Sequence, residues 1–324
     1  MKKSSYACLS FSLVVLFCMY HQVAATSLIY NMKIRRVFRT NDAVTIAKVL
    51  GKESASIWLA SGVPIFAQRN RHIVDQAKEI DVCQKSTAGG VIFNMRHVSE
   101  KAWWAEITTA VEREQSHERG TVVRDCARTG MDDIVMAAGY NFFPSQTTQV
   151  VLYGIGGVPT RLALNAYEQF DTLVGTRFFS VGGGMELSNS FISGLKQSLT
   201  AIAQVRCIHF FNRYWHPVLP RGSKIQPGNV TDFLLSMQYR KKRTVFEIGY
   251  NVTFFNNQAV LLSSGPVKSD MFLRQSGYFS IAHLCKKVRI FDKALLVGAG
   301  CAFSRAQKFD TQSASCWANV SVIF

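Results

Sequence analysis

The clearest alternation of hydrophobic and polar positions lies between Asp232 and Phe254. In its first half every second residue is apolar or aromatic, and these are Phe233, Leu235, Met237 and Tyr239. The second half repeats the pattern with Phe246, Ile248, Tyr250, Val252 and Phe254. Only a short basic turn at Lys241 and Lys242 separates the halves. A period of two on both sides of a tight turn predicts an antiparallel hairpin with one apolar face, and each strand has about the length that a tilted strand needs to cross a bilayer.

The same alternation predicts strands along most of the chain. Before the hairpin we expect them at residues 90–98, 102–112, 133–143, 147–157, 171–183 and 199–211, and after it at 276–288, 294–304 and 315–324. Long connections at 212–230 and 256–275 alternate with short turns near 241–242 and 291–293. Short turns at one end and long loops at the other are typical of a transmembrane β-barrel. The sequence therefore predicts an all-β fold, an antiparallel barrel of about 12 strands (10–14).

The last ten residues carry their own signature. Counting back from Phe324, every second residue is small or apolar, in the order Val322, Val320, Ala318 and Cys316. This segment resembles the closing strand of Gram-negative outer-membrane β-barrels, although Val322 stands where an aromatic residue is more usual. The resemblance implies that Phe324, Val322 and Val320 form an assembly signal. It also implies two partners, the barrel-assembly machinery and the lipid of the outer membrane.

The N-terminus predicts export. Lys2 and Lys3 precede an apolar stretch at residues 9–20 that is too short to span a bilayer, and Val23-Ala24-Ala25 offers a cleavage site. We therefore expect a signal peptide at 1–25 and a barrel at 87–324. Residues 26–86 fit less well, with expected helices starting at Asn41 and covering 72–80. They are interpreted as an extension, a plug or the first strands of the barrel.

Charge and cysteine content narrow the class further. Without the leader the chain has 35 basic and 21 acidic residues, a net charge of +14. This excess suits a basic lumen or an anionic lipid surface, and no nucleic-acid-binding motif accompanies it. Six cysteines remain in the mature chain without a metal-binding spacing. Cys301 and Cys316 are expected on neighbouring strands, where they either form a disulfide or serve as small apolar side chains.

The sequence predicts no catalytic site, no cofactor site and no metal site. The six mature histidines are dispersed, without the pairs at helical spacing that bind zinc. The glycine clusters at 154–157 and 182–184 lack the lysine of a phosphate loop, and no Gly-x-Ser-x-Gly elbow occurs. The sequence therefore argues against an enzyme.

Polar residues on the face opposite the apolar one are expected to line the lumen. They are Glu106, Glu112, Asp232, Gln238, Arg240, Glu247 and Asn251. In a wide barrel such residues surround water and bias ion passage, and in a narrow one they pair and close it. The small residues Gly298, Gly300 and Ala302 are expected to leave room inside.

These patterns predict an outer-membrane, porin-like channel for passive diffusion of small solutes. The second hypothesis is a non-conducting surface barrel whose long loops bind a partner, as an adhesin or structural protein does. The third is a soluble secreted β-sandwich, in which the same alternation buries one face against a second sheet. The identity of the solute or surface partner and the oligomeric state do not follow from the sequence.

Overall fold

A computed structural model describes the chain in segments. These are residues 56–75, 80–99, 102–119, 124–160, 178–193, 197–211, 213–214, 224–226, 228–256, 259–262, 265–268, 271–290, 293–306 and 311–324. The expected signal peptide and the expected helix at Asn41 lie outside the described residues. Within the described ones, no helix is long and apolar enough to span a membrane.

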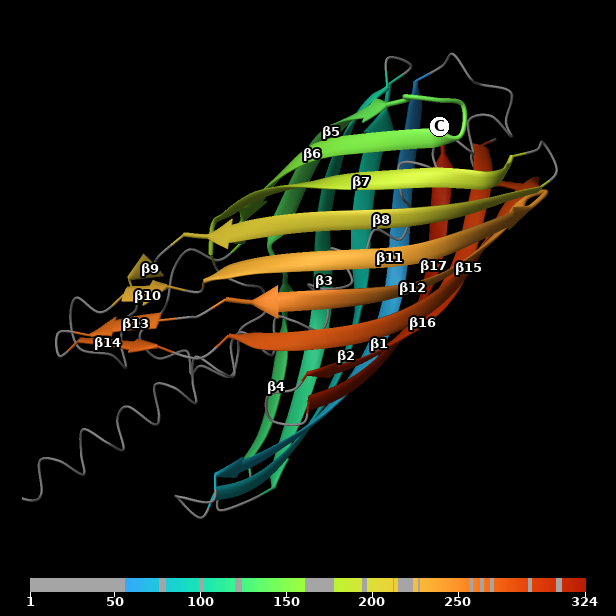
Figure 1. The fold of residues 1–324 in the computed structure, drawn as a ribbon. Coiled ribbons are helices and arrows are strands. Elements are labelled where there is room, and N and C mark those ends of the chain that lie inside the picture. Colours follow the sequence, from blue (N-terminus) through green and yellow to red (C-terminus); the bar gives the residue numbers. More distant parts are fainter. Residues whose placement is uncertain are drawn as a thin grey trace, which may run out of the picture.

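The protein is a closed antiparallel β-barrel of 12 strands (Figure 1). The strands are β1 (Ile57–Asp75), β2 (Ile80–Val98), β3 (Trp103–Arg119), β4 (Arg124–Met131), β5 (Ile134–Phe142), β6 (Thr148–Val158), β7 (Ser180–Ser193), β8 (Gln197–Phe210), β11 (Asn229–Lys241), β12 (Thr244–Phe255), β15 (Phe272–Ile290), β16 (Lys293–Ala306) and β17 (Thr311–Ile323). Consecutive strands pair in sequence order, except that β3 pairs with both β4 and β5, and β17 returns to β1. This return closes the ring, as a barrel in lipid requires.

Two of these elements share one position in the barrel. The first part of β3 pairs with β5, and its later part pairs with β4. Between them, Asp132 and Asp133 are buried and interrupt the strand. The Asp132 amide still bonds the Ala110 carbonyl at 2.8 Å, and the Asp133 amide donates to Asp132 Oδ1 at 2.7 Å. Thus β4 and β5 act as a single strand broken by a bulge.

The last residue helps to close the ring. The Phe324 amide donates to the Trp58 carbonyl at 2.9 Å, and the Trp58 amide donates back to the Phe324 carbonyl at 3.3 Å. From there β17 and β1 pair as far as Gln312 and Asn70. The outward side chains of the terminal strand include Val320 and Phe324, both well exposed.

The two ends of the barrel differ. The end that contains Phe324 has short connections, such as the two residues between β11 and β12, and is called here the short-turn end. The opposite end, the long-loop end, contains β9 (Arg213–Tyr214) and β10 (Lys224–Gln226) in one loop and β13 (Ala259–Leu262) and β14 (Gly265–Lys268) in another. Because β10 pairs with β13, the two loops form one small sheet beyond the barrel (Figure 1).

The fold corrects two expectations near the N-terminus. Residues 57–75 and 80–86 are strand, so the barrel begins at Ile57 rather than at residue 87. The helix expected at 72–80 is wrong, since His72–Asp75 end β1 and Ile80 starts β2. Cross-strand pairs such as His72 with Cys83 extend to the end of this hairpin, and pairing overrides the local helical pattern. Of the three interpretations of residues 26–86, the first strands of the barrel describe residues 57–75 and 80–86.

The expected strand at 171–183 is also displaced. Residues 171–177 lie outside the described segments, and the strand there is β7, from Ser180 to Ser193. Gly182, Gly183 and Gly184 lie within β7. A Cβ on Gly184 would come closer than 3.0 Å to the ring of Tyr153, which stands directly opposite on β6. Gly184 therefore leaves room for the aromatic ring of Tyr153, and the strand continues through it.

Candidate functional site

The barrel has an apolar outer face and a largely polar inner one. On the β11–β12 hairpin the outward side chains include Leu235 and Ile248, which are 63% and 66% exposed. The alternate residues point inward and are buried or half-buried. The inward set contains all seven residues expected to line the lumen, namely Glu106, Glu112, Asp232, Gln238, Arg240, Glu247 and Asn251.

A row of charged and polar side chains crosses four neighbouring strands inside the barrel. Arg206 on β8 stands opposite Asp232 on β11, Asp232 opposite Thr253 on β12, and Thr253 opposite Arg274 on β15. Arg206 donates to Asp232 Oδ2 from Nη2 and from Nε, the latter at 3.2 Å. Thr253 donates to Asp232 Oδ1 at 2.6 Å, and Arg274 donates to Thr253 at 3.4 Å. All four are buried, so Asp232 is the central acceptor of this row.

A second polar level lies nearer the short-turn end on the same strands. Glu247 on β12 accepts a hydrogen bond from the Tyr278 hydroxyl at 2.5 Å, and Arg240 donates to Ser198 at 3.1 Å. We call the inward residues of β7, β8, β11, β12 and β15 the polar wall. On this wall acidic and basic groups alternate, so its charges largely compensate each other.

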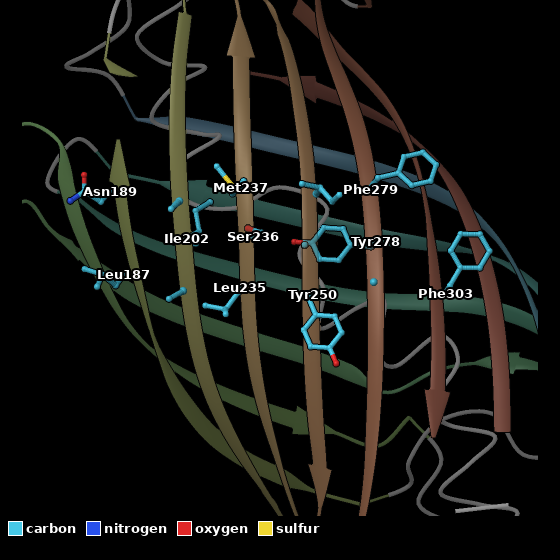
Figure 2. Close-up of a pocket in the computed structure, with 15 residues that line it drawn as sticks. Leu187, Asn189, Ile202, Leu235, Ser236, Met237, Tyr250, Tyr278, Phe279 and Phe303 are labelled. Atoms are coloured by element: carbon cyan, nitrogen blue, oxygen red, sulfur yellow. The ribbon is translucent and has the colours of Figure 1, made fainter. Parts of the chain in front are cut away.

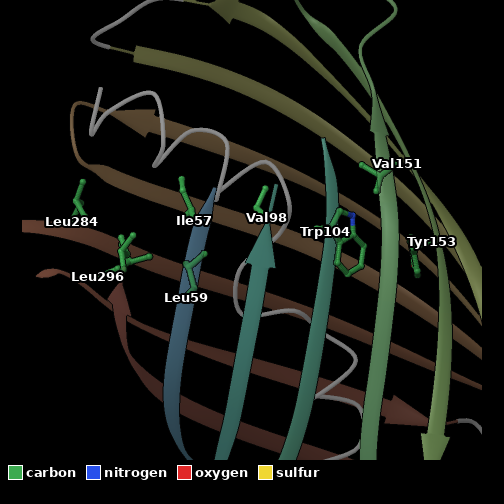
Figure 3. Packing of buried hydrophobic residues seen from close by; sticks show 9 residues of the cluster. Ile57, Leu59, Val98, Trp104, Val151, Tyr153, Leu284 and Leu296 are labelled. Atoms are coloured by element: carbon green, nitrogen blue, oxygen red, sulfur yellow. The ribbon is translucent and has the colours of Figure 1, made fainter. Parts of the chain in front are cut away.

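The opposite side of the lumen is mainly apolar. At the short-turn end, inward side chains from β1, β2, β3, β6, β15, β16 and β17 form one buried cluster, which Figure 3 shows from close by. It contains Ile57, Leu59, Val98, Trp104, Val151, Tyr153, Leu284, Leu296 and Ile323. A second cluster on β1, β2 and β3 includes Val63, Ile65 and Ile92, with Trp317 packed against it. We call these two clusters the apolar wall.

The apolar wall also contains the charged side chains of Arg96 and Glu106, which lie next to each other and to the Trp104 ring. Arg96 Nε lies 3.9 Å from Glu106 Oε2, and its guanidinium stands 4.7 Å from the centroid of the Trp104 ring. Trp104 therefore points inward while its neighbour Trp103 points outward. Of the two, only Trp103 has the outward position that an aromatic belt at a strand end requires.

Small inward residues do not leave the room that the sequence predicted. Gly298, Gly300 and Ala302 do face the lumen on β16. A Cβ on Gly300 would come closer than 3.0 Å to the ring of Trp317, its partner on β17. Trp317 thus fills the space above Gly300.

Several inward polar atoms have no hydrogen-bond partner. Glu186 on β7 is 1% exposed, and neither of its carboxylate oxygens is hydrogen-bonded. The same holds for both amide atoms of Asn141, for Gln149 Nε2, for Asn251 Oδ1 and for Asn319 Nδ2. Buried polar atoms are almost always hydrogen-bonded to protein or to ordered water. These atoms are therefore candidate positions for ordered water in the lumen.

Three of the important inward residues were not predicted from the sequence. Glu186 was missed because β7 was placed too early, although it lies between the outward residues Met185 and Leu187. Arg274 was assigned to a loop, whereas β15 starts at Phe272. Arg206 was within an expected strand, but its pairing with Asp232 depends on a register that alternation does not give.

A hollow of about 770 Å³ opens on the outer face of the barrel, not in the lumen (Figure 2). Outward side chains of β7, β11, β12, β15 and β16 line it, among them Leu187, Met237, Tyr250, Phe279 and Phe303. Most of these side chains are 45% or more exposed. The hollow therefore belongs to the apolar surface that faces lipid in a barrel of this kind.

Among the described residues, no group of three or more His, Cys, Asp or Glu side chains could hold a metal ion. Cys301 and Cys316 stand directly opposite each other on β16 and β17, as expected, and both are free thiols in this structure. Their disulfide stays a prediction.

Deleting Phe324 is expected to reduce the yield of folded barrel about tenfold or more, because the deletion removes both hydrogen bonds to Trp58 and the expected assembly signal. The measurement is the fraction of protein in membranes that shifts in mobility between unboiled and boiled samples. Replacing Gln312, an exposed residue at the other end of the same strand, by alanine is the control. Normal assembly of the truncated chain would contradict the proposed signal.

Comparison with solved structures adds to this picture. The chain is similar to an outer membrane channel from Pseudomonas putida F1, with a TM-score of 0.55 and 10% identity over 83% of this chain and 96% of that chain. It is also similar to the transport unit of the autotransporter AIDA-I from Escherichia coli, with a TM-score of 0.52 and 9% identity over 94% and 96% of the two chains. No family model and no curated protein matches the sequence. The chain therefore has the fold of the Gram-negative outer-membrane β-barrels, a class that contains both channels and transport barrels.

Proposed function

We propose that the protein is an outer-membrane channel for the passive diffusion of small solutes. The observation that carries the proposal is the set of inward polar atoms without a protein partner, headed by the Glu186 carboxylate. An isolated ionised carboxylate in a dry interior is strongly unfavourable. Water or a passing solute in the lumen would satisfy these atoms. The proposed channel contains no catalytic group and no cofactor, and selectivity follows from lumen width and charge.

The number of strands limits the size of the solute that the lumen could admit. Barrels of about eight strands are filled by their own side chains, whereas those of about 16 leave a wide aqueous channel. With 12 strands, a polar wall and an apolar wall, the lumen suits small solutes. A polar wall with compensating charges would favour neither large anions nor large cations.

The test is conductance of the refolded, heat-modifiable protein in planar lipid bilayers. We expect discrete conductance steps, and we expect Glu186→Gln to lower the ratio of cation to anion permeability in a KCl gradient. The control is Arg113→Gln, because Arg113 is exposed on the outward face of β3 and should not alter the reversal potential. A folded, inserted barrel that never conducts would overturn the proposal that the protein is a channel.

One observation favours a second function, a surface barrel whose loops bind a partner. The loops between β8 and β11 and between β12 and β15 pair with each other to form the small sheet at the long-loop end. A paired loop sheet presents a more ordered surface than separate loops do. Shortening the loop at 212–228 should then abolish cell-surface binding and leave conductance intact.

A further inference from the structure

Glu186 is a buried inward carboxylate on β7 whose neighbours direct their hydrogen bonds elsewhere. It is 1% exposed, and within the described part of the chain no group donates a hydrogen bond to either of its oxygens. Gln204, directly opposite on β8, donates instead to the Tyr153 hydroxyl at 2.5 Å. Arg206, two residues further along β8, donates to Asp232 from Nε and Nη2. The Glu186 carboxylate is therefore an acceptor that these two neighbouring donors do not satisfy.

Two carboxamides with unbonded atoms stand beside Glu186. Val151 on β6 (Figure 3) is directly opposite Glu186 on one side and directly opposite Asn141 of β5 on the other. Asn141 is 1% exposed, and neither its Oδ1 nor its Nδ2 is hydrogen-bonded. Gln149 lies two residues before Val151 on the same face of β6, is buried, and has no acceptor for its Nε2. Three adjacent strands thus each contribute one incompletely bonded polar side chain.

The three side chains are close enough to share one small ligand. Neighbouring strands lie about 4.8 Å apart, so the backbones at Asn141 and Glu186 are separated by about 10 Å across β6. Gln149 is diagonal to both, a spacing of roughly 7–8 Å that long side chains bridge. The wall of a closed barrel is concave on its inner face, so inward side chains converge. Glu186, Asn141 and Gln149 therefore border one position in the lumen, above Val151.

The unbonded atoms define what a ligand at this position must carry. Glu186 offers two acceptor oxygens and Asn141 Oδ1 offers a third, so the ligand needs N–H donors. Asn141 Nδ2 and Gln149 Nε2 are donors, so the ligand also needs an acceptor. The one formal charge among the three side chains is negative, and a bond from an ammonium group to a carboxylate is of the strong, charge-assisted kind. A ligand that reaches from Glu186 to Asn141 crosses Val151, where its connecting atoms are best apolar.

We propose that Glu186, Asn141 and Gln149 form a binding site for a compact solute that carries an ammonium group and a carbonyl oxygen. The ammonium group donates to Glu186 and to Asn141 Oδ1, and the carbonyl oxygen accepts from Asn141 Nδ2 and Gln149 Nε2. The carbon between them packs on Val151. The inference rests on the proposed function, because it names a class of solute for the lumen, but binding itself does not require conduction.

The experiment is isothermal titration calorimetry of glycinamide into the refolded, heat-modifiable barrel in mild detergent. Glycinamide carries both groups, acetamide lacks the ammonium group, and methylamine lacks the carbonyl. We expect acetamide to bind at least about tenfold more weakly than glycinamide, because a hydrogen bond to a charged group is lost. Glycine should also bind more weakly, since its carboxylate lies near that of Glu186.

Two variants assign the contacts to residues. Glu186→Gln should weaken glycinamide binding about tenfold or more, and it should not weaken acetamide binding further. Gln149→Leu should weaken glycinamide binding roughly fivefold, the usual effect of a neutral hydrogen bond, and leave methylamine binding unchanged. The comparison of glycinamide with acetamide uses the unaltered chain, so it stands even if a variant fails to fold.

The matched control is Glu247→Gln, which removes an inward carboxylate that already accepts a hydrogen bond from Tyr278. It should change glycinamide affinity by less than about twofold. Equal weakening by both glutamate variants would overturn the site, because the effect would then follow the charge of the whole lumen. Failure of the unaltered barrel to bind glycinamide would also overturn it, and the unbonded atoms would then hold water alone. Binding without conductance would keep the site and reject the channel, and conductance without binding would do the reverse.

Discussion

Replacing Asp232 by alanine is expected to lower the free energy of unfolding by about 3–5 kcal/mol. The change removes the carboxylate that accepts hydrogen bonds from Nε and Nη2 of Arg206 and from the Thr253 hydroxyl. The buried Arg206 cation would lose this counter-charge, which is costly in a medium of low polarity. The measurement is urea unfolding of the barrel in lipid vesicles, followed by tryptophan fluorescence.

Two comparisons separate the lost ion pair from other effects. Thr231→Ala changes the adjacent, outward position and should alter the free energy of unfolding by less than about 0.5 kcal/mol. The double change Asp232→Leu with Arg206→Leu removes both charges and should recover much of the loss, because buried ion pairs are often replaceable by apolar pairs. A loss below about 1 kcal/mol for Asp232→Ala would mean that lumen water already solvates Arg206.

The alternation of apolar and polar residues was sufficient to predict the barrel class and to predict which residues face inward. It worked on β11 and β12 because lipid selects apolar residues outside and a hydrated lumen tolerates polar residues inside, at a period of two. It failed where this contrast weakens. The run Gly182–Gly184 has no outward apolar signal, so β7 was misplaced and Glu186 was missed. Residues 72–75 have no alternation of apolar and polar positions, and their strand is maintained by pairing with β2.

The candidate site was harder to predict than the fold because it depends on register. The row from Arg206 to Arg274 exists only because four strands align these residues side by side, and no local pattern fixes that alignment. The pairing of β10 with β13 joins two separate loops, so no local pattern predicts it either. The net positive charge suited either a basic lumen or an anionic lipid surface. The inward charges of the polar wall are mixed, which does not favour the first of these alternatives.

Replacing Gly249 by alanine is expected to lower the free energy of unfolding by about 1–3 kcal/mol. Gly249 stands opposite Tyr278, and the tyrosine ring passes over it to reach Glu247 with its hydroxyl. A Cβ on Gly249 would lie closer than 3.0 Å to three atoms of that side chain. The ring must therefore move, and the hydrogen bond to Glu247 is lost with it. Urea unfolding in vesicles measures the stability, and near-ultraviolet circular dichroism reports the altered tyrosine environment.

The control for this change is Gly156→Ala, since an added Cβ on Gly156 meets no atom within 4 Å. That variant should be as stable as the parent or slightly more so, because alanine restricts the unfolded chain. Adding Tyr278→Leu to Gly249→Ala should relieve the overlap, so the pair should be more stable than the sum of the two single effects. Strict additivity would show that ring and glycine do not interact. Tyr153 over Gly184 and Trp317 over Gly300 repeat the arrangement, so the same coupling is expected wherever an inward ring lies across a glycine.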